Sequence, residues 1–191
     1  MRLVTPGRDL LPEYVAALTT GWSPNTSRDV SGEQLAAIQT DQVAFLDNLC
    51  STGGGGLIML PGGQQVERLP GPILWISDGA FCGSINLRFV PGSEALPAHV
   101  SGHIGYAVVR WKRRRGIATR ALGLMLRIAA AEGLRRVQVT CDDDNIASRR
   151  VVEANGGLFA GAAPHPDRPE RHKLLFWIAT GRRHRGGRKK D

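Results

Sequence analysis

The sequence is poor in the residues that build disulfide and metal sites. Its 191 residues contain three cysteines, Cys50, Cys82 and Cys141. Their number is odd, and none stands in a CxxC pair or at the spacing of a Cys/His zinc site, so neither a disulfide framework nor a structural zinc site is expected. Free cysteines are typical of a reducing compartment, which predicts a cytoplasmic protein.

Long apolar runs and nucleotide signatures are also missing. No uninterrupted stretch approaches 20 apolar residues, and the first ten residues, MRLVTPGRDL, are already polar, so we expect neither a membrane span nor a leader. The glycines at 53–56 have no Lys-Ser/Thr partner and follow no strand, which excludes a P-loop. His99 and His103 lie four apart without the Glu of HExxH, so no metal site is expected.

What the sequence does contain is typical of one globular domain. Hydrophobic residues make up 42% and charged residues 22% of the chain. The formal net charge is +8, but residues 181–191, GRRHRGGRKKD, supply +5 of it and residues 1–180 only +3. A Gly/Arg segment without apolar residues cannot bury enough surface to fold. We therefore predict a folded domain over residues 1–180 and a disordered basic tail over 181–191.

Hydrophobic periodicity predicts alternating helices and strands. Helices are expected at 9–19, 31–48, 117–132 and 145–154, strands at 1–5, 73–78, 80–90, 103–109, 136–141, 158–162 and 172–180, and a long flexible connection at 51–72. Asp78-Gly79 is a hairpin turn signal between two of the strands. The order predicts a mixed α/β sheet with at least one crossover through the helix at 117–132.

The most informative segment joins the strand at 103–109 to the next helix. It reads Arg113-Arg114-Arg115-Gly116-Ile117-Ala118. A helix start points unpaired backbone N–H groups and the positive end of its dipole outward, and Gly116 with the small Ala118 lets an anion approach the backbone. Three arginines add charge suited to a ligand with several phosphates. The segment predicts a phosphate site, although basic surface helices with the same features also occur without one.

The spacing Arg113-x-x-Gly116-x-Ala118 resembles the Arg/Gln-x-x-Gly-x-Gly/Ala motif of the GNAT superfamily of acyl-CoA-dependent N-acetyltransferases. The resemblance covers roughly Gly102–Gly157, and NIASRRVVEANGG is most similar to the branch of ribosomal-protein N-terminal acetyltransferases. It implies an α/β (α+β) GNAT fold. That fold has a single mixed, mostly antiparallel sheet of six or seven strands with a central splayed parallel pair, flanked by about four helices.

The resemblance also implies acetyl-CoA as cosubstrate and assigns residues to it. The turn and helix start would bind the pyrophosphate, the end of the preceding strand would pair with the pantetheine arm, and an N–H of that strand would polarise the thioester carbonyl. Asn145 would reach the cofactor arm, and it is equally suited to be a helix N-cap. The cofactor-binding candidates are Val108, Val109, Arg110, Arg113, Arg114, Arg115, Gly116, Ile117, Ala118, Thr119, Arg120 and Asn145.

Acetyl transfer to an amine needs a group that takes a proton from the amine and a group that gives one to the departing thiolate. His103 stands where related enzymes often carry a Glu, so it is the candidate base; a histidine that hydrogen-bonds at a strand end is the alternative. Many members of the superfamily use a Tyr as acid where this chain has Val152. Ser148 matches a Ser proposed for that duty in the ribosomal-protein branch, with helix packing as its alternative.

The resemblance implies an N-acetyltransferase that acts on a primary amine of a small molecule or peptide, and direct attack in a ternary complex is the expected mechanism. Cys141 lies on a predicted strand and is better explained as a small core residue than as an acyl carrier. Three alternative functions stay open: a non-catalytic acyl-CoA sensor, an RNA-associated module that uses the basic tail, and a drug-modifying acetyltransferase. The protein could also form a homodimer. The acceptor cannot be read from the sequence.

Overall fold

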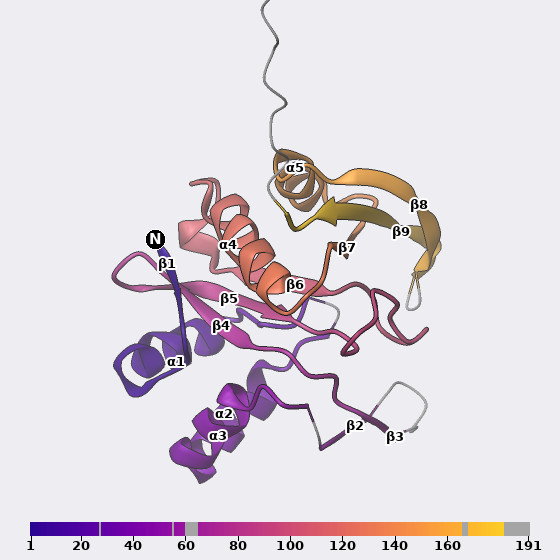
Figure 1. The fold of residues 1–191 in the computed structure, drawn as a ribbon. Helices are drawn as coiled ribbons and strands as arrows, with labels where there is room; N and C mark the ends of the chain where they lie inside the picture. Colours follow the sequence, from indigo (N-terminus) through magenta and orange to yellow (C-terminus); the bar gives the residue numbers. More distant parts are fainter. Residues whose placement is uncertain (27, 55, 60–64, 166–167, 182–191) are drawn as a thin grey trace, which may run out of the picture.

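The computed structural model describes residues 1–26, 28–54, 56–59, 65–165 and 168–181, and Figure 1 shows their arrangement. The predicted tail at 181–191 lies outside the described residues except for Gly181. Within the described part, no helix is long and apolar enough to cross a membrane.

Two antiparallel sheets form the centre of the fold. The first has the order β1-β4-β5-β6, with β1 (Arg2–Val4), β4 (Ile73–Ser77), β5 (Phe81–Leu87) and β6 (Ile104–Val108). The second has the order β7-β9-β8, with β7 (Arg136–Asp142), β8 (Leu158–His165) and β9 (Arg168–Ala179). The hairpin between β4 and β5 confirms the turn expected at Asp78-Gly79.

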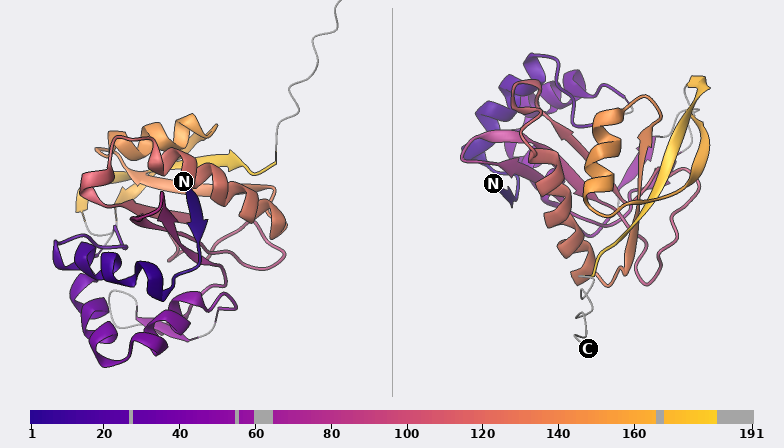
Figure 2. Two further views of the ribbon diagram at one scale, coloured as in Figure 1. Left: turned by 90° about the vertical axis from the view of Figure 1, so that its left-hand side faces the viewer. Right: turned by 90° about the horizontal axis from the view of Figure 1, so that it is seen from above.

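Helices cover both faces of the first sheet and one face of the second (Figure 2). On one face lie α4 (Ile117–Ala131) and α5 (Ile146–Ala154), and on the other α1 (Leu11–Thr19), α2 (Ser31–Thr40) and α3 (Gln42–Cys50). Short 3₁₀ turns, η1 (Arg8–Leu10) and η2 (Arg110–Lys112), precede α1 and follow β6. The apolar face expected on α4 is confirmed, because Ala121, Leu122, Met125 and Ala129 are all fully buried between the helix and the sheets.

The two sheets meet at a single joint, where the chain enters β6. The amide of His103 donates to the carbonyl oxygen of Gln138 in β7 at 2.7 Å, and the amide of Gln138 donates to Nδ1 of His103 at 3.0 Å. No other backbone hydrogen bond joins β6 to β7 among the described residues. The edge of β6 that faces β7 is therefore open toward its carboxyl end, as the expected splayed pair requires.

The expected α/β fold is confirmed, with differences in the elements. The single sheet of six or seven strands is found as two sheets that separate at the His103–Gln138 joint, and a further hairpin brings the described strands to nine. That hairpin, β2 (Leu57–Met59) with β3 (Gln65–Glu67), lies in the segment predicted as a flexible connection. Two hydrogen bonds tie the residues that follow this hairpin to the end of β5. The amides of Leu87 and Phe89 donate to the carbonyl oxygens of Pro72 and Pro70, respectively.

The helix predicted over residues 31–48 is two helices. Asp41 is extended (φ −158°, ψ 102°), and its Oδ1 accepts from the amides of Val43 at 2.9 Å and Ala44 at 3.0 Å. A side-chain acceptor at a helix start satisfies amides that have no partner within the helix. Asp41 therefore ends α2 and begins α3.

We predict that Asp41→Ala lowers the free energy of unfolding by about 1 kcal/mol, because two amides of α3 lose their acceptor. Asp47→Ala removes the same charge from an exposed position inside α3 and should leave stability unchanged or slightly higher, since Ala favours a helix. Urea unfolding of both variants checks this. Equal stabilities would show that Asp41 does not cap the helix.

Candidate functional site

The turn between β6 and α4 presents a row of unpaired backbone amides. Arg114 (φ 63°) and Gly116 (φ 69°) both adopt left-handed conformations on either side of Arg115. Among the described residues, the amides of residues 114–119 donate to no acceptor, whereas that of Arg120 donates to the carbonyl oxygen of Gly116 at 3.1 Å. Successive free N–H groups in such a turn, at the positive end of a helix, are an anion-binding arrangement.

Gly116 leaves this turn open. Its φ is one that side-chain-bearing residues rarely adopt, and a Cβ there would meet nothing within 4 Å. A ligand can therefore approach the backbone directly. Ile117 is buried, and Ala118 and Thr119 are half-buried. None of the three has a charged side chain, so these residues can contribute to the site through their backbone amides.

The arginines expected at the site have different surroundings. Arg113 reaches back to β6, where its Nε donates to the carbonyl oxygen of Val108 at 3.0 Å. Arg120 braces the turn, because its Nη2 donates to the carbonyl oxygen of Arg115 at 3.2 Å. Arg110, Arg114 and Arg115 are exposed. The turn therefore combines arginines that fix its shape with arginines that face solvent.

The open edge of β6 leads from this turn toward the joint with β7. The amide of Val109 donates to the carbonyl oxygen of Cys82 in β5 at 3.0 Å. Because backbone groups alternate between the two sides of a strand, the amides of Tyr106 and Val108 point away from β5. The amide of Val108 is thus free to pair with an extended ligand, whereas its carbonyl oxygen already accepts from Nε of Arg113. Val109 is also predicted to bind the cofactor; its amide is bound to Cys82 and its side chain is fully buried, and a cofactor contact at this residue stays a prediction.

At the start of α5, Asn145 and Ser148 form a connected group with a tyrosine that the sequence reasoning missed. Asn145 is the N-cap of α5, and its Oδ1 accepts from the amide of Ser148 at 3.0 Å, which confirms its capping role. The hydroxyl of Ser148 lies 2.7 Å from the hydroxyl of Tyr106 in β6. The pair bridges the opening between β6 and α5. Only this contact, not a motif, identifies Tyr106.

The protonation of Tyr106 follows from its surroundings. Burial raises the pKa of Tyr106 to about 12, and the bond with Ser148 opposes that rise. The phenol therefore keeps its proton near neutral pH. Val152, at the position where the resemblance would place a tyrosine, is completely buried and carries no polar group.

His103 is fully buried at the sheet joint, which bears on its predicted role as a base. Burial, with a smaller effect of the nearby Arg88 charge, lowers the pKa of its imidazole, so the ring is neutral. A neutral imidazole has one lone pair, and Nδ1 already uses it to accept the Gln138 amide. Nε2 has no hydrogen-bond partner among the described atoms. This geometry fits a histidine that holds the joint.

The acidic run Asp142–Asp144, which begins at the last residue of β7, is neutralised by residues of β9. Asp142 pairs with Arg168 and Lys173, and Asp143 lies 2.7 Å from Nη2 of Arg171. Asp144 pairs with the same Arg171 at 2.9 Å. No group of three or more His, Cys, Asp or Glu side chains suited to a metal ion occurs in the described ranges. These carboxylates hold the β9 strand beside the start of α5.

Comparison with known proteins finds one family model that matches the part of the chain containing this site. Residues 64–157 match the acetyltransferase (GNAT) domain, and no curated protein matches the sequence. Similar solved structures include the microcin C7 self-immunity acetyltransferase in complex with acetyl-CoA and AMP, with a TM-score of 0.60, 12% identity and coverage of 93% of this chain and 91% of that one.

Ribosomal-protein acetyltransferases are also among the similar structures. The ribosomal L7/L12 α-N-protein acetyltransferase RimL in complex with coenzyme A has a TM-score of 0.60 and 14% identity over 93% of this chain and 92% of that one. The acetyltransferase from Salmonella typhimurium that modifies the N-terminal serine of L7/L12 has a TM-score of 0.56 and 13% identity, covering 88% and 87%. At these identities the likeness concerns the fold.

We predict that His103 makes the protein less stable in acid. The folded pKa of His103 lies below its unfolded value near 6.5, so the unfolded chain takes up a proton first, and stability falls as the pH drops below about 6.5, by up to about 1.4 kcal/mol per pH unit. In His103→Asn the side-chain oxygen can still accept the Gln138 amide but does not titrate. Urea unfolding at pH 7.5 and 5.5 should show a smaller loss for the variant; equal losses would contradict the buried neutral imidazole.

Proposed function

Since residues 64–157 match the acetyltransferase (GNAT) domain, we propose that the protein is a GNAT acetyltransferase that transfers the acetyl group of acetyl-CoA to a primary amine by direct attack in a ternary complex. The observation that carries this proposal is the row of unpaired amides at the start of α4, continuous with the open edge of β6. The row of amides at the start of α4 suits the diphosphate of the cosubstrate, and the open edge of β6 suits its extended, amide-containing pantetheine arm.

Acetyl-CoA would bind along the turn before α4 and the open edge of β6. The amides of residues 114–119 would bind the pyrophosphate, with the Arg114 and Arg115 side chains adding positive charge. Arg113 and Arg120 would keep the turn in shape through their bonds to Val108 and Arg115. Bound acetyl-CoA supplies the activated thioester. The free N–H groups of the β6 edge would pair with its pantetheine arm, and that of Val108 would polarise the thioester carbonyl.

Ser148 and Tyr106 are the proposed acid. The amine nitrogen forms a bond to the carbonyl carbon, the carbon–sulfur bond breaks, and the thiolate takes the proton of the Ser148 hydroxyl. Tyr106, protonated and 2.7 Å away, would replace that proton. The side chain of Asn145 would contact the cofactor arm while capping α5. Burial raises the pKa of the Cys141 thiol, which favours direct attack over a cysteine relay.

The base that takes the amine proton stays a prediction at His103. The Gln138 amide occupies the lone pair that a base needs, so the acid side of the reaction is the better supported half. A non-catalytic acyl-CoA sensor is the second candidate function, favoured by Val152 where a tyrosine acid is common. Release of free thiol from acetyl-CoA in the presence of amines separates the enzyme from the sensor.

We further propose that residues 1–180 form one acetyltransferase domain and that the protein works in the cytoplasm. Its three cysteines are all free, as expected in a reducing compartment. The RNA-associated alternative depends on the tail beyond Gly181, which is not among the described residues.

Gly116→Asp should abolish acetyl-CoA binding, because it puts a carboxylate among amides that would hold a diphosphate. Gly133→Asp is a matched control, since Gly133 is also exposed and left-handed (φ 85°) with nothing within 4 Å of its Cβ position, but lies past the other end of α4. Calorimetry with acetyl-CoA should give no heat for Gly116→Asp and wild-type affinity for Gly133→Asp. Unchanged affinity in Gly116→Asp would reject the site.

Ser148→Ala should lower kcat about 100-fold with little change in the KM for acetyl-CoA, because a proton donor acts on the chemical step. Tyr106→Phe should lower kcat less, and the double variant should be no slower than Ser148→Ala, since the two hydroxyls act as a unit. Tyr14→Phe removes a buried hydroxyl on the opposite face and should keep kcat. Steady-state thiol release checks all four variants. Additive losses of kcat in the double variant would contradict the transfer of a proton from Tyr106 to Ser148.

A further inference from the structure

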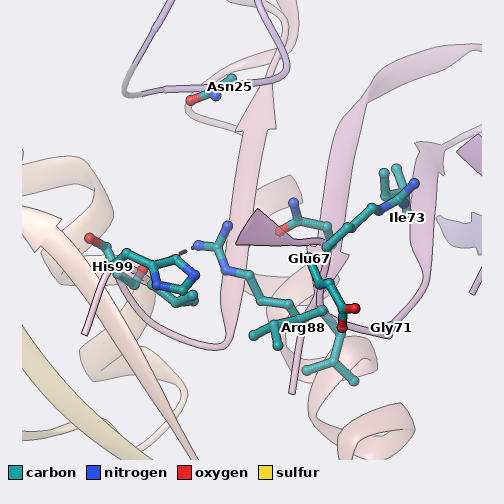
Figure 3. Close-up of a pocket in the computed structure, with 12 residues that line it drawn as sticks. Asn25, Glu67, Gly71, Ile73, Arg88 and His99 are labelled. Carbon is teal, nitrogen blue, oxygen red and sulfur yellow. Dashed lines mark hydrogen bonds between the residues drawn. The ribbon is translucent and has the colours of Figure 1, made fainter. Parts of the chain in front are cut away.

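A cavity lies on the face of the first sheet opposite α4, apart from the turn proposed for the cosubstrate (Figure 3). Its volume is about 340 Å³, within the range of roughly 300–1,000 Å³ found for small-molecule sites. Elements far apart in the sequence build it: the end of β3, the ends of β4 and β5, and the loop that precedes β6. Its lining includes Glu67, Arg68, Asn86, Arg88, His99 and Ser101.

Arg88 places a positive charge inside this cavity. Its Nε donates to the carbonyl oxygen of Gly102 at 2.8 Å, and its Nη2 to that of Ser101 at 3.2 Å. Figure 3 shows the guanidinium between His99 and Glu67. The two carbonyls fix its position, but neutral acceptors do not compensate its charge.

No described carboxylate lies within 4.0 Å of this guanidinium, so Arg88 forms no ion pair in the described chain. Burial lowers the pKa of Arg88, the direction expected for a cation removed from water without a counter-charge. A half-buried cation is costly unless it is paired. A cavity that holds one therefore favours a ligand that brings the missing negative charge.

The other charged groups of the wall do not reverse this preference. Arg68 adds a second positive charge and donates to the carbonyl oxygen of Asn48 at 3.2 Å. Glu67 is the one carboxylate in the lining, it is exposed, and it forms no ion pair with a described residue. Arg68 and Arg88 outweigh Glu67, so these groups give the lining a net positive charge.

The cavity adjoins the strand proposed to hold the thioester. Oδ1 of Asn86, in the cavity wall, accepts from the amide of Gly105 in β6 at 2.9 Å, one residue before Tyr106. The carbonyl of Gly102, which holds Arg88, directly precedes His103 at the sheet joint. A molecule anchored at Arg88 would therefore lie beside β6 on the face opposite the acid pair.

We propose that the acceptor amine carries an anionic group, either a carboxylate or a phosphate, and that this group binds the guanidinium of Arg88 in the cavity. This inference rests on the proposed function, acetyl transfer to an amine. A guanidinium binds either group with charge-assisted hydrogen bonds. Polycationic acceptors such as polyamines and aminoglycosides are excluded by the same charge. The substrate class is thus a small primary amine with an acidic group.

Paired amines test this directly. The wild-type protein is given acetyl-CoA with β-alanine or β-alaninamide, with 4-aminobutyrate or 4-aminobutanamide, and with aminoethyl phosphate or ethanolamine, and thiol release is followed. We expect kcat/KM to be at least about tenfold higher for the anionic member of a pair, the size expected for a charge-assisted bond. The carboxylate and phosphate arms show which anion fits. Equal rates within every pair, or no turnover of any anionic member, would overturn the proposal.

Variants separate this inference from the proposed function. Arg88→Met should bring the ratio within a pair close to one, and Arg88→Lys, which keeps the charge, should keep part of it. Arg127→Met removes a charge from the exposed face of α4 and should leave the ratio unchanged. Acetyl-CoA affinity, measured by calorimetry, should be the same in all of them. Intact acetyl-CoA binding with no preference for anions would reject the role of Arg88 alone, whereas loss of acetyl-CoA binding by the wild type would reject the function itself.

Discussion

The joint between His103 and Gln138 is the contact on which the site depends. It is the one place where backbone hydrogen bonding links the two sheets in the described chain. Because β7 leaves β6 after this point, one edge of β6 keeps free amides in the middle of the fold. Sheet edges inside a protein usually pair with another strand, so an open edge here is a place for an extended ligand.

The same joint explains why the functional groups lie where they do. α4 connects the two separating strands, so it begins at the open end of β6, and its unpaired amides face the opening. α5 follows β7 and closes the other side, where Ser148 meets Tyr106. The ion pairs from Asp142, Asp143 and Asp144 to β9 keep the start of α5 in place. The turn before α4, the open edge of β6 and the Ser148–Tyr106 pair thus all follow from the separation of β6 from β7.

Local features of the site could be predicted from the sequence, and long-range features could not. The apolar face of α4, the open helix start at Gly116 and the cap at Asn145 depend on neighbouring residues, whose pattern carries the information. The contact of Tyr106 with Ser148 and the position of Arg88 in a cavity depend on segments that meet only in the folded chain. The break at Asp41 and the β2–β3 hairpin were missed because an Asp inside a helical pattern, or a Gly-rich segment, is ambiguous without its tertiary partners. His103 is a further long-range case, because nothing near it in the chain indicates that the amide of Gln138 in the neighbouring strand occupies the lone pair of Nδ1.

The most direct test of the central claim is an amide-resolved NMR titration of the full chain with coenzyme A. The account predicts that the backbone N–H signals of residues 114–119, together with that of Val108, shift the most, because these groups would donate hydrogen bonds to the diphosphate and the pantetheine arm. Saturating coenzyme A that leaves these signals in place, or shifts only signals from another face of the protein, would contradict it.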